Sequence, residues 1–168
     1  MDDQTIWNRV VATADASYDR LSATARSRLD EHLSRIMQLK QDLYECSQAA
    51  GSSQICRECG GTCCLNGKFH VSVLDLLVYR SARVEPVVPH FENSPLCPYG
   101  GTAGCLMPPR FRSMTCLVFN CELVENRMDD REKERFAAGE HALRKAILGA
   151  EELLEYRAGR AVLLSGND

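Results

Sequence analysis

The sequence predicts a mainly α-helical protein in which a long helical hairpin carries an irregular, cysteine-rich loop region. Two observations predict this fold. Apolar residues recur with helical spacing near both ends of the chain, and the middle is rich in cysteine, glycine and proline. The length of 168 residues suits a single domain. Within residues 1–168 we expect a helical scaffold, residues 1–50 and 129–160, and a cysteine-cluster segment, residues 51–125.

The first long helix is expected over residues 25–50. Its apolar residues recur at alternating steps of three and four, with charged residues between them, which is typical of a helix that buries one face. This face consists of Ala25, Leu29, Ile36, Leu39, Leu43, Cys46 and Ala50. The run Gly51-Ser52-Ser53 predicts the end of the helix. Cys46 is therefore expected in the core.

A second long helix is expected from about residue 129 to residue 158. Asp129 and Asp130 suit its positive N-terminal end, and Gly159 is a suitable stop. Its apolar face consists of Phe136, Leu143, Ala146, Ile147, Ala150, Leu153 and Leu154. Because each long helix has one apolar stripe, the simplest arrangement packs the two antiparallel against each other.

Two shorter helices are also expected. One lies within residues 1–20, and its apolar side consists of Ile6, Trp7 and Val10. The other covers residues 73–82, because Ser72 followed by Asp75 forms a capping-box pattern. Its core-facing residues are Val73, Leu74, Leu77 and Val78.

The rest of the middle segment is expected to be irregular. Glycines interrupt the cysteine-rich part at Gly60, Gly61 and Gly67. Prolines then forbid long regular elements between residues 84 and 113. They are Pro86, Pro89, Pro95, Pro98, Pro108 and Pro109. This stretch therefore predicts a folded loop, and a loop of this length usually has a function.

Eight of the nine cysteines lie within 66 residues, in two groups. They are Cys56, Cys59, Cys63, Cys64, Cys97, Cys105, Cys116 and Cys121. The Cys-x-x-Cys spacing at the start is the usual half-site for zinc. A tetrahedral zinc ion or a cubane [4Fe-4S] cluster takes about four thiolates. The eight cysteines could therefore supply two four-sulfur sites, or one site with spare thiols.

Other side chains could take part in such a site. His70 follows the first cysteine group, and His90 lies in the proline-rich loop. Imidazole suits both zinc and iron, so either histidine could complete a mixed nitrogen–sulfur site. Arg110 and Arg112, near Cys116, could donate hydrogen bonds to thiolates or offset their negative charge, and exposed, salt-bridged arginines are an equal alternative.

The order of these residues resembles that of the YkgJ-type cysteine-cluster family, which is described as chelating zinc or iron. The matching positions are Cys56-x2-Cys59-x3-Cys63-Cys64, Cys97-Pro98-Tyr99, Gly104-Cys105 and Arg112-x3-Cys116-x2-Phe119-x-Cys121. The resemblance covers residues 56–121 and implies metal ligation by the eight cysteines. Ser113 and Asn120 stand where the family usually has proline. Larger relatives include a flagellin lysine methylase, so the resemblance leaves enzymatic activity open.

Composition and termini exclude several classes of protein. The net charge of −3 gives no reason to expect a nucleic-acid partner. The apolar runs are shorter than the roughly 18 residues of a membrane span, and the acidic N-terminus does not resemble a secretory signal. We therefore expect a cytoplasmic protein without a membrane partner, and the helical face could support a homodimer. Common nucleotide-binding, protease and hydrolase motifs are absent.

The sequence leaves three functions open. The first is a metal-binding protein that holds zinc or an iron–sulfur cluster, with no catalytic residue or protein partner identified. The second is an iron–sulfur redox enzyme or electron carrier. The third is a metal-free thiol–disulfide switch, because the spacing of Cys56 and Cys59 also occurs in redox motifs.

Overall fold

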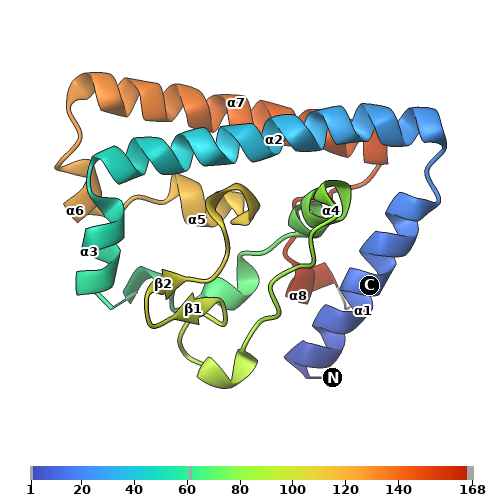
Figure 1. Cartoon of the computed structure of the whole chain (residues 1–168), viewed down its shortest axis with the longest axis horizontal. Coiled ribbons are helices and arrows are strands. Elements are labelled where there is room, and N and C mark those ends of the chain that lie inside the picture. The colour runs from blue at the N-terminus through green and yellow to red at the C-terminus, as the bar shows by residue number, and fades with distance from the viewer. Residues whose placement is uncertain (1, 61, 166–168) are drawn as a thin grey trace.

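The computed structural model describes residues 2–60 and 62–165 and is mainly helical, as predicted. Two long helices, α2 (Ala23–Ala49) and α7 (Asp130–Leu154), run antiparallel along one side of the molecule (Figure 1). The shorter helices lie beneath this pair. They are α1 (Asp3–Asp19), α3 (Ser52–Glu58), α4 (Val73–Ala82), α5 (Met114–Val118), α6 (Glu122–Glu125) and α8 (Val162–Ser165).

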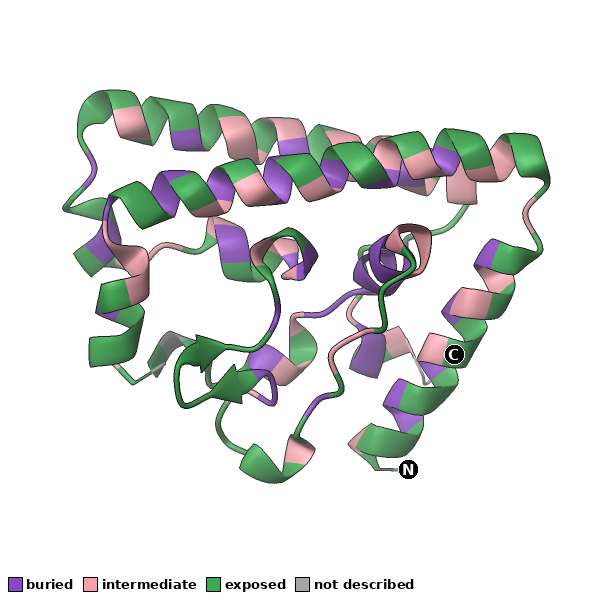
Figure 2. Ribbon diagram, viewed as in Figure 1, coloured by how far each residue is buried: buried purple, intermediate pink, exposed green. Residues whose placement is uncertain are grey.

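Side chains that interlock along α2 and α7 hold the long pair together. Leu33, Ile36 and Leu143 are completely buried, and buried residues form a stripe along each helix (Figure 2). Gly149 in α7 leaves room for the ring of His32, because a Cβ at this glycine would lie 2.8 Å from the ring's Cε1. The predicted antiparallel packing of the two apolar stripes is therefore present.

The ends of the long helices follow local capping rules. Ser22 caps α2 by accepting a hydrogen bond from the backbone N–H of Ala25, so the helix begins two residues before the predicted start. Asp129 and Glu132 form a capping box at the start of α7. The predicted stop at Gly159 is wrong. The helix ends at Leu154, because Glu155 adopts a left-handed conformation with φ of +60°.

Helix α4 lies under α2 and is joined to it by a buried ion pair. Asp75 and Ser72 form the predicted capping box, with Ser72 N and Oγ donating to Asp75 Oδ2 at 2.8 and 2.7 Å. The other carboxylate oxygen of Asp75 accepts from Lys40 Nζ of α2 at 2.5 Å. Both oxygens of this buried carboxylate therefore have donors, as a charge in the core requires.

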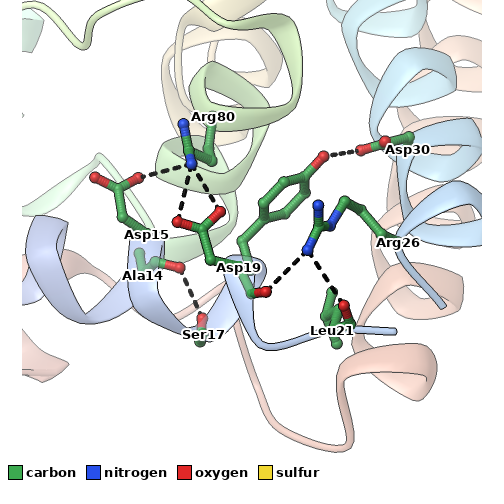
Figure 3. A network of polar contacts seen from close by, with 9 residues as sticks. Ala14, Asp15, Ser17, Asp19, Leu21, Arg26, Asp30 and Arg80 are labelled. Atoms are coloured by element: carbon green, nitrogen blue, oxygen red, sulfur yellow. Dashed lines mark hydrogen bonds and ion pairs between the residues drawn. The ribbon is translucent and has the colours of Figure 1, made fainter. Parts of the chain in front are cut away.

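The N-terminal helix packs against α4 and α8, and its predicted apolar side is buried. A polar network fixes its end (Figure 3). Tyr18 donates to Asp30 Oδ1 at 2.6 Å, and Arg80 of α4 binds the carboxylate of Asp19 at 2.7 Å. Arg26 donates to the carbonyl of Asp19 at 2.8 Å, which satisfies an acceptor at the end of α1. This network joins α1, α2 and α4.

The prediction that the cysteine-rich part is irregular is wrong for residues 52–58, which form a helix. Gly51, with φ of +82°, ends α2 and leads directly into α3, which contains Cys56. Only glycine adopts such a φ without strain, so one residue both ends one helix and begins the next. The rest of the segment contains short elements. They are the 3-10 turns η1 (Thr62–Cys64), η2 (Gly67–Phe69), η3 (Phe91–Asn93) and η4 (Pro109–Phe111), and the strands β1 (Gly100–Gly101) and β2 (Gly104–Cys105).

None of the helices within residues 2–60 and 62–165 combines the length and apolar character needed to cross a bilayer. The nonpolar residues instead form one core beneath α2, to which α1, α4 and the C-terminal segment all contribute. The segment after α7 is fixed to α4 by a hydrogen bond from Leu74 N to Ala158 O at 2.7 Å, and to the residues just before α4 by one from Val162 N to Val71 O at 2.8 Å.

Candidate metal-binding site

The predicted cysteine ligands lie on short elements beneath the end of the long pair where α2 finishes and α7 begins (Figure 1). Their positions are Cys56 in α3, Cys59 directly after it, Cys64 in η1, Cys97 before β1, Cys105 in β2, Cys116 in α5 and Cys121 at the start of α6. The side chain of Cys63 lies outside the described residues. Cys46 is buried in α2 with 4% exposure, as predicted for a core residue.

The two cysteine groups meet first through α3. This helix packs against β2 and against α6. Cys56 and Cys59 therefore belong to an element that contacts the strand of Cys105 and the helix that begins at Cys121. The fold brings these elements together although the two groups are more than 30 residues apart in sequence.

The turn that follows the first cysteine group also contacts the second group, because Gly67 of η2 lies against the side chain of Cys97. A Cβ placed on Gly67 would lie 2.3 Å from Cys97 Sγ, so only a residue without a side chain fits there. Burial raises the pKa of the Cys97 thiol, while the backbone N–H groups of Tyr99 and Gly100 lower it. N–H groups that approach a sulfur in this way also stabilise a metal-bound thiolate.

The residue after this turn, His70, makes a direct contact with Cys116 of the second group. The ring Nδ1 of His70 lies 3.3 Å from Cys116 Sγ, and either atom could be the donor. Ser113, which is almost completely buried, donates its hydroxyl to the same sulfur at 3.2 Å. The same serine caps α5 by accepting from Cys116 N at 3.3 Å. One sulfur is thus approached by a ring nitrogen and a hydroxyl.

The electrostatics of this contact favour the neutral forms of both partners. Cys116 reaches solvent, but the protein atoms around its thiol raise its pKa to about 12. The hydrogen bond from Ser113 lowers that pKa, and the thiols of Cys105 and Cys97 raise it. Burial lowers the pKa of His70. A metal-free site therefore holds a thiol beside a neutral imidazole near neutral pH, and the three thiols lie close enough to influence one another.

The remaining predicted participants lie elsewhere. His90 pairs with Glu92 at 3.0 Å on the surface, with its side chain 54% exposed. Arg112 donates from Nε to the carbonyl of Met107 at 2.9 Å and lies over the ring of Tyr44, 5.0 Å from its centre. The expectation that Arg112 donates to a thiolate is therefore not met, because its guanidinium is engaged by a carbonyl and an aromatic ring.

Within the part of the chain that the structure describes, no three His, Cys, Asp or Glu side chains converge closely enough to hold one metal ion. Among the described donors, His70 and Cys116 form a close pair, and the thiols of Cys97 and Cys105 lie near enough to raise the pKa of Cys116. Sulfur and imidazole nitrogen are the donors that zinc and iron favour, so the donor set fits the metals named above. The glycine against Cys97 and the hydroxyl of Ser113 were not recognised from sequence. The spacing of Ser113 and Cys116, which is that of a helix cap and its third residue, was the available signal.

Comparison with known proteins gives no further guide, because no family model, no curated protein and no solved structure matches the chain.

Proposed function

We propose that this chain is a metal-binding protein that holds zinc or an iron–sulfur cluster on the cysteines of residues 56–121. The observation that carries the proposal is that the segment of the first cysteine group and the turn after it lie against the segment of the second group. Helix α3 packs on β2, Gly67 lies against Cys97 and His70 contacts Cys116. The resemblance to the YkgJ-type family points to the same function.

The proposed metal would connect segments that the apolar core holds only in part. The elements of the cysteine-cluster segment are short, and α5 and α6 have five and four residues. Exposed apolar side chains flank several of the cysteines: Leu65, Leu96, Leu106 and Phe119. A metal bound by both groups would cross-link these elements and contribute its binding free energy to folding.

The chemistry that such a site supports depends on whether a coordination position stays open. A closed four-ligand zinc site is structural, whereas an iron–sulfur cluster in the same place would carry electrons. The close pair of His70 and Cys116 gives a specific reason to favour a mononuclear ion at that point, because a [4Fe-4S] cluster is usually held by four thiolates.

The test is elemental analysis together with an ultraviolet–visible spectrum of the full chain purified without oxygen. Stoichiometric zinc in a colourless protein supports a zinc site, and iron with matching sulfide in a brown protein supports a cluster. Protein that has no metal and takes up none on reconstitution would contradict the proposal. Thiol counting with and without reductant would then test the thiol–disulfide switch.

A further inference from the structure

We propose that His70 is itself a ligand, so that one metal ion is held by an imidazole nitrogen together with cysteine sulfur. This inference rests on the proposed function and makes it more specific. It assigns a mixed nitrogen–sulfur site, which takes a divalent ion of the zinc class, to the contact between the turn after the first cysteine group and Cys116 of the second group. The ligand atoms that the structure brings together are His70 Nδ1 and Cys116 Sγ.

The distance between these two atoms suits ligands of one ion. Zinc lies roughly 2.0–2.1 Å from an imidazole nitrogen and about 2.3 Å from a thiolate, so two such ligands in a tetrahedral site lie about 3.5 Å apart. In the structure Nδ1 and Sγ are 3.3 Å apart. The pair therefore needs to open by only a few tenths of an ångström to admit an ion.

Both proposed ligands are held in place by neighbours. His70 follows η2, and its backbone N–H donates to the carbonyl of Gly67 at 3.1 Å. Gly67 is the residue that Cys97 Sγ contacts, so one turn positions His70 and lies against a second candidate thiolate. On the other side, Ser113 accepts the N–H of Cys116, which directs its own hydroxyl hydrogen toward the sulfur. Hydrogen bonds of this kind orient metal ligands.

His90 provides the comparison within the same chain. Its ring is exposed and pairs with the carboxylate of Glu92, as an ordinary surface histidine does. His70 is half-buried, and the contact that the structure records for its ring is a thiol sulfur. A plain hydrogen bond between a thiol and an imidazole would give the same contact without metal. The experiment must therefore report the ligand atoms themselves.

The test is a Co²⁺ titration of the full-length, metal-free chain under reducing, oxygen-free conditions, followed by visible spectroscopy. Co²⁺ takes the place of zinc in tetrahedral sites, and its d–d bands move to longer wavelength as nitrogen ligands are replaced by sulfur. The wild type is expected to show bands of a mixed site. His70→Cys should shift these bands to longer wavelength and strengthen the sulfur-to-cobalt charge-transfer absorption. His70→Ala should weaken Co²⁺ binding at least tenfold, and His90→Ala should change neither property.

The outcomes separate this inference from the function on which it rests. If His70→Ala and His70→Cys bind Co²⁺ with wild-type affinity and wild-type bands, His70 is not a ligand and the metal-binding proposal stands on cysteine alone. If the wild type binds neither Co²⁺, zinc nor iron, the proposed function itself is wrong. Circular dichroism of each variant shows whether it folds. The band shift in His70→Cys distinguishes ligation from a structural role, because a structural change would not add a sulfur ligand.

Discussion

The ammonium of Lys40 lies 2.5 Å from Oδ1 of Asp75, and the two side chains are 1% and 4% exposed. Ser72 supplies the donors for the other carboxylate oxygen, so the buried anion is fully hydrogen-bonded. The pair joins α2 to the first turn of α4, a helix that contributes several residues to the core. A buried pair with such complete hydrogen bonding is costly to break from one side only.

Lys40→Met should therefore lower the free energy of unfolding by about 3–5 kcal/mol, because it leaves the carboxylate of Asp75 buried without its cation. The double variant Lys40→Met, Asp75→Asn should recover a large part of this loss, since asparagine carries no charge and still accepts from Ser72. Urea denaturation of both variants measures the difference. A single variant within about 1 kcal/mol of the wild type would show that the pair is not isolated from solvent.

For the phenol of Tyr79 we predict an effect on the free energy of unfolding opposite to that of Lys40→Met. Tyr79 is buried and stacked on Phe111, with ring centres 4.3 Å apart. The backbone N–H of Val87 is near enough to lower the pKa of its hydroxyl, but no well-aligned hydrogen bond to this oxygen forms among the described residues. An unsatisfied buried hydroxyl is destabilising, so Tyr79→Phe should leave stability unchanged or raise it by about 1 kcal/mol. The control is Tyr18→Phe, which should destabilise because the hydroxyl of Tyr18 binds Asp30. Thermal unfolding of the two variants compares them.

The same residue predicts a dependence on alkaline pH. Burial raises the pKa of Tyr79 above that of an exposed tyrosine. Its contribution to stability is therefore fully present below about pH 10, the pKa in the unfolded chain, and is lost as the pH rises further. The free energy of unfolding of the wild type should fall as the pH rises above about 10, and that of Tyr79→Phe should fall less. Equal slopes in the two proteins would contradict this assignment.

A substitution at Gly67 tests whether its close contact with Cys97 matters for stability and metal binding. Gly67→Ala should disrupt the contact with Cys97, because its Cβ would lie 2.3 Å from the sulfur and 2.9 Å from Cys97 Cβ. We expect lower stability and lower metal content, read by thermal unfolding and elemental analysis. The matched control is Gly139→Ala in α7, whose Cβ would lie 3.0 Å from a movable methyl group of Leu43. That change should leave metal content intact. Normal metal content in Gly67→Ala would show that Cys97 is not a ligand.

The parts of the fold that were predictable are those with local signals. The bounds of α4 follow from Ser72 and Asp75, and the stripe of α2 follows from its periodic apolar residues. Lys40 was not recognised as buried, because a lysine in a helix gives no local sign of the carboxylate that neutralises it 35 residues away. Helix α3 was missed because its seven residues are too few to show a period.

The candidate site likewise has features that local sequence signals predict and others that they do not. Spacing within the sequence predicts the cysteines as candidate ligands, with His70 and His90 as possible additions. The choice between the histidines required the tertiary fold, because His70 meets Cys116 across 46 residues whereas His90 meets its near neighbour Glu92. Contacts of that range depend on how α4 and α5 pack under α2, which no local pattern reports.

The most direct test of the central claim is the metal content per chain of three proteins purified side by side without oxygen: the wild type, Cys116→Ser and Cys46→Ala. Cys46 is buried in the long helix pair, where its thiol contacts the carbonyl of Glu132 at 3.8 Å, so its loss should cost only about 1 kcal/mol of packing. The account predicts stoichiometric metal in the wild type and in Cys46→Ala, and clearly less in Cys116→Ser. Equal metal content in all three proteins, or none in the wild type, would contradict it.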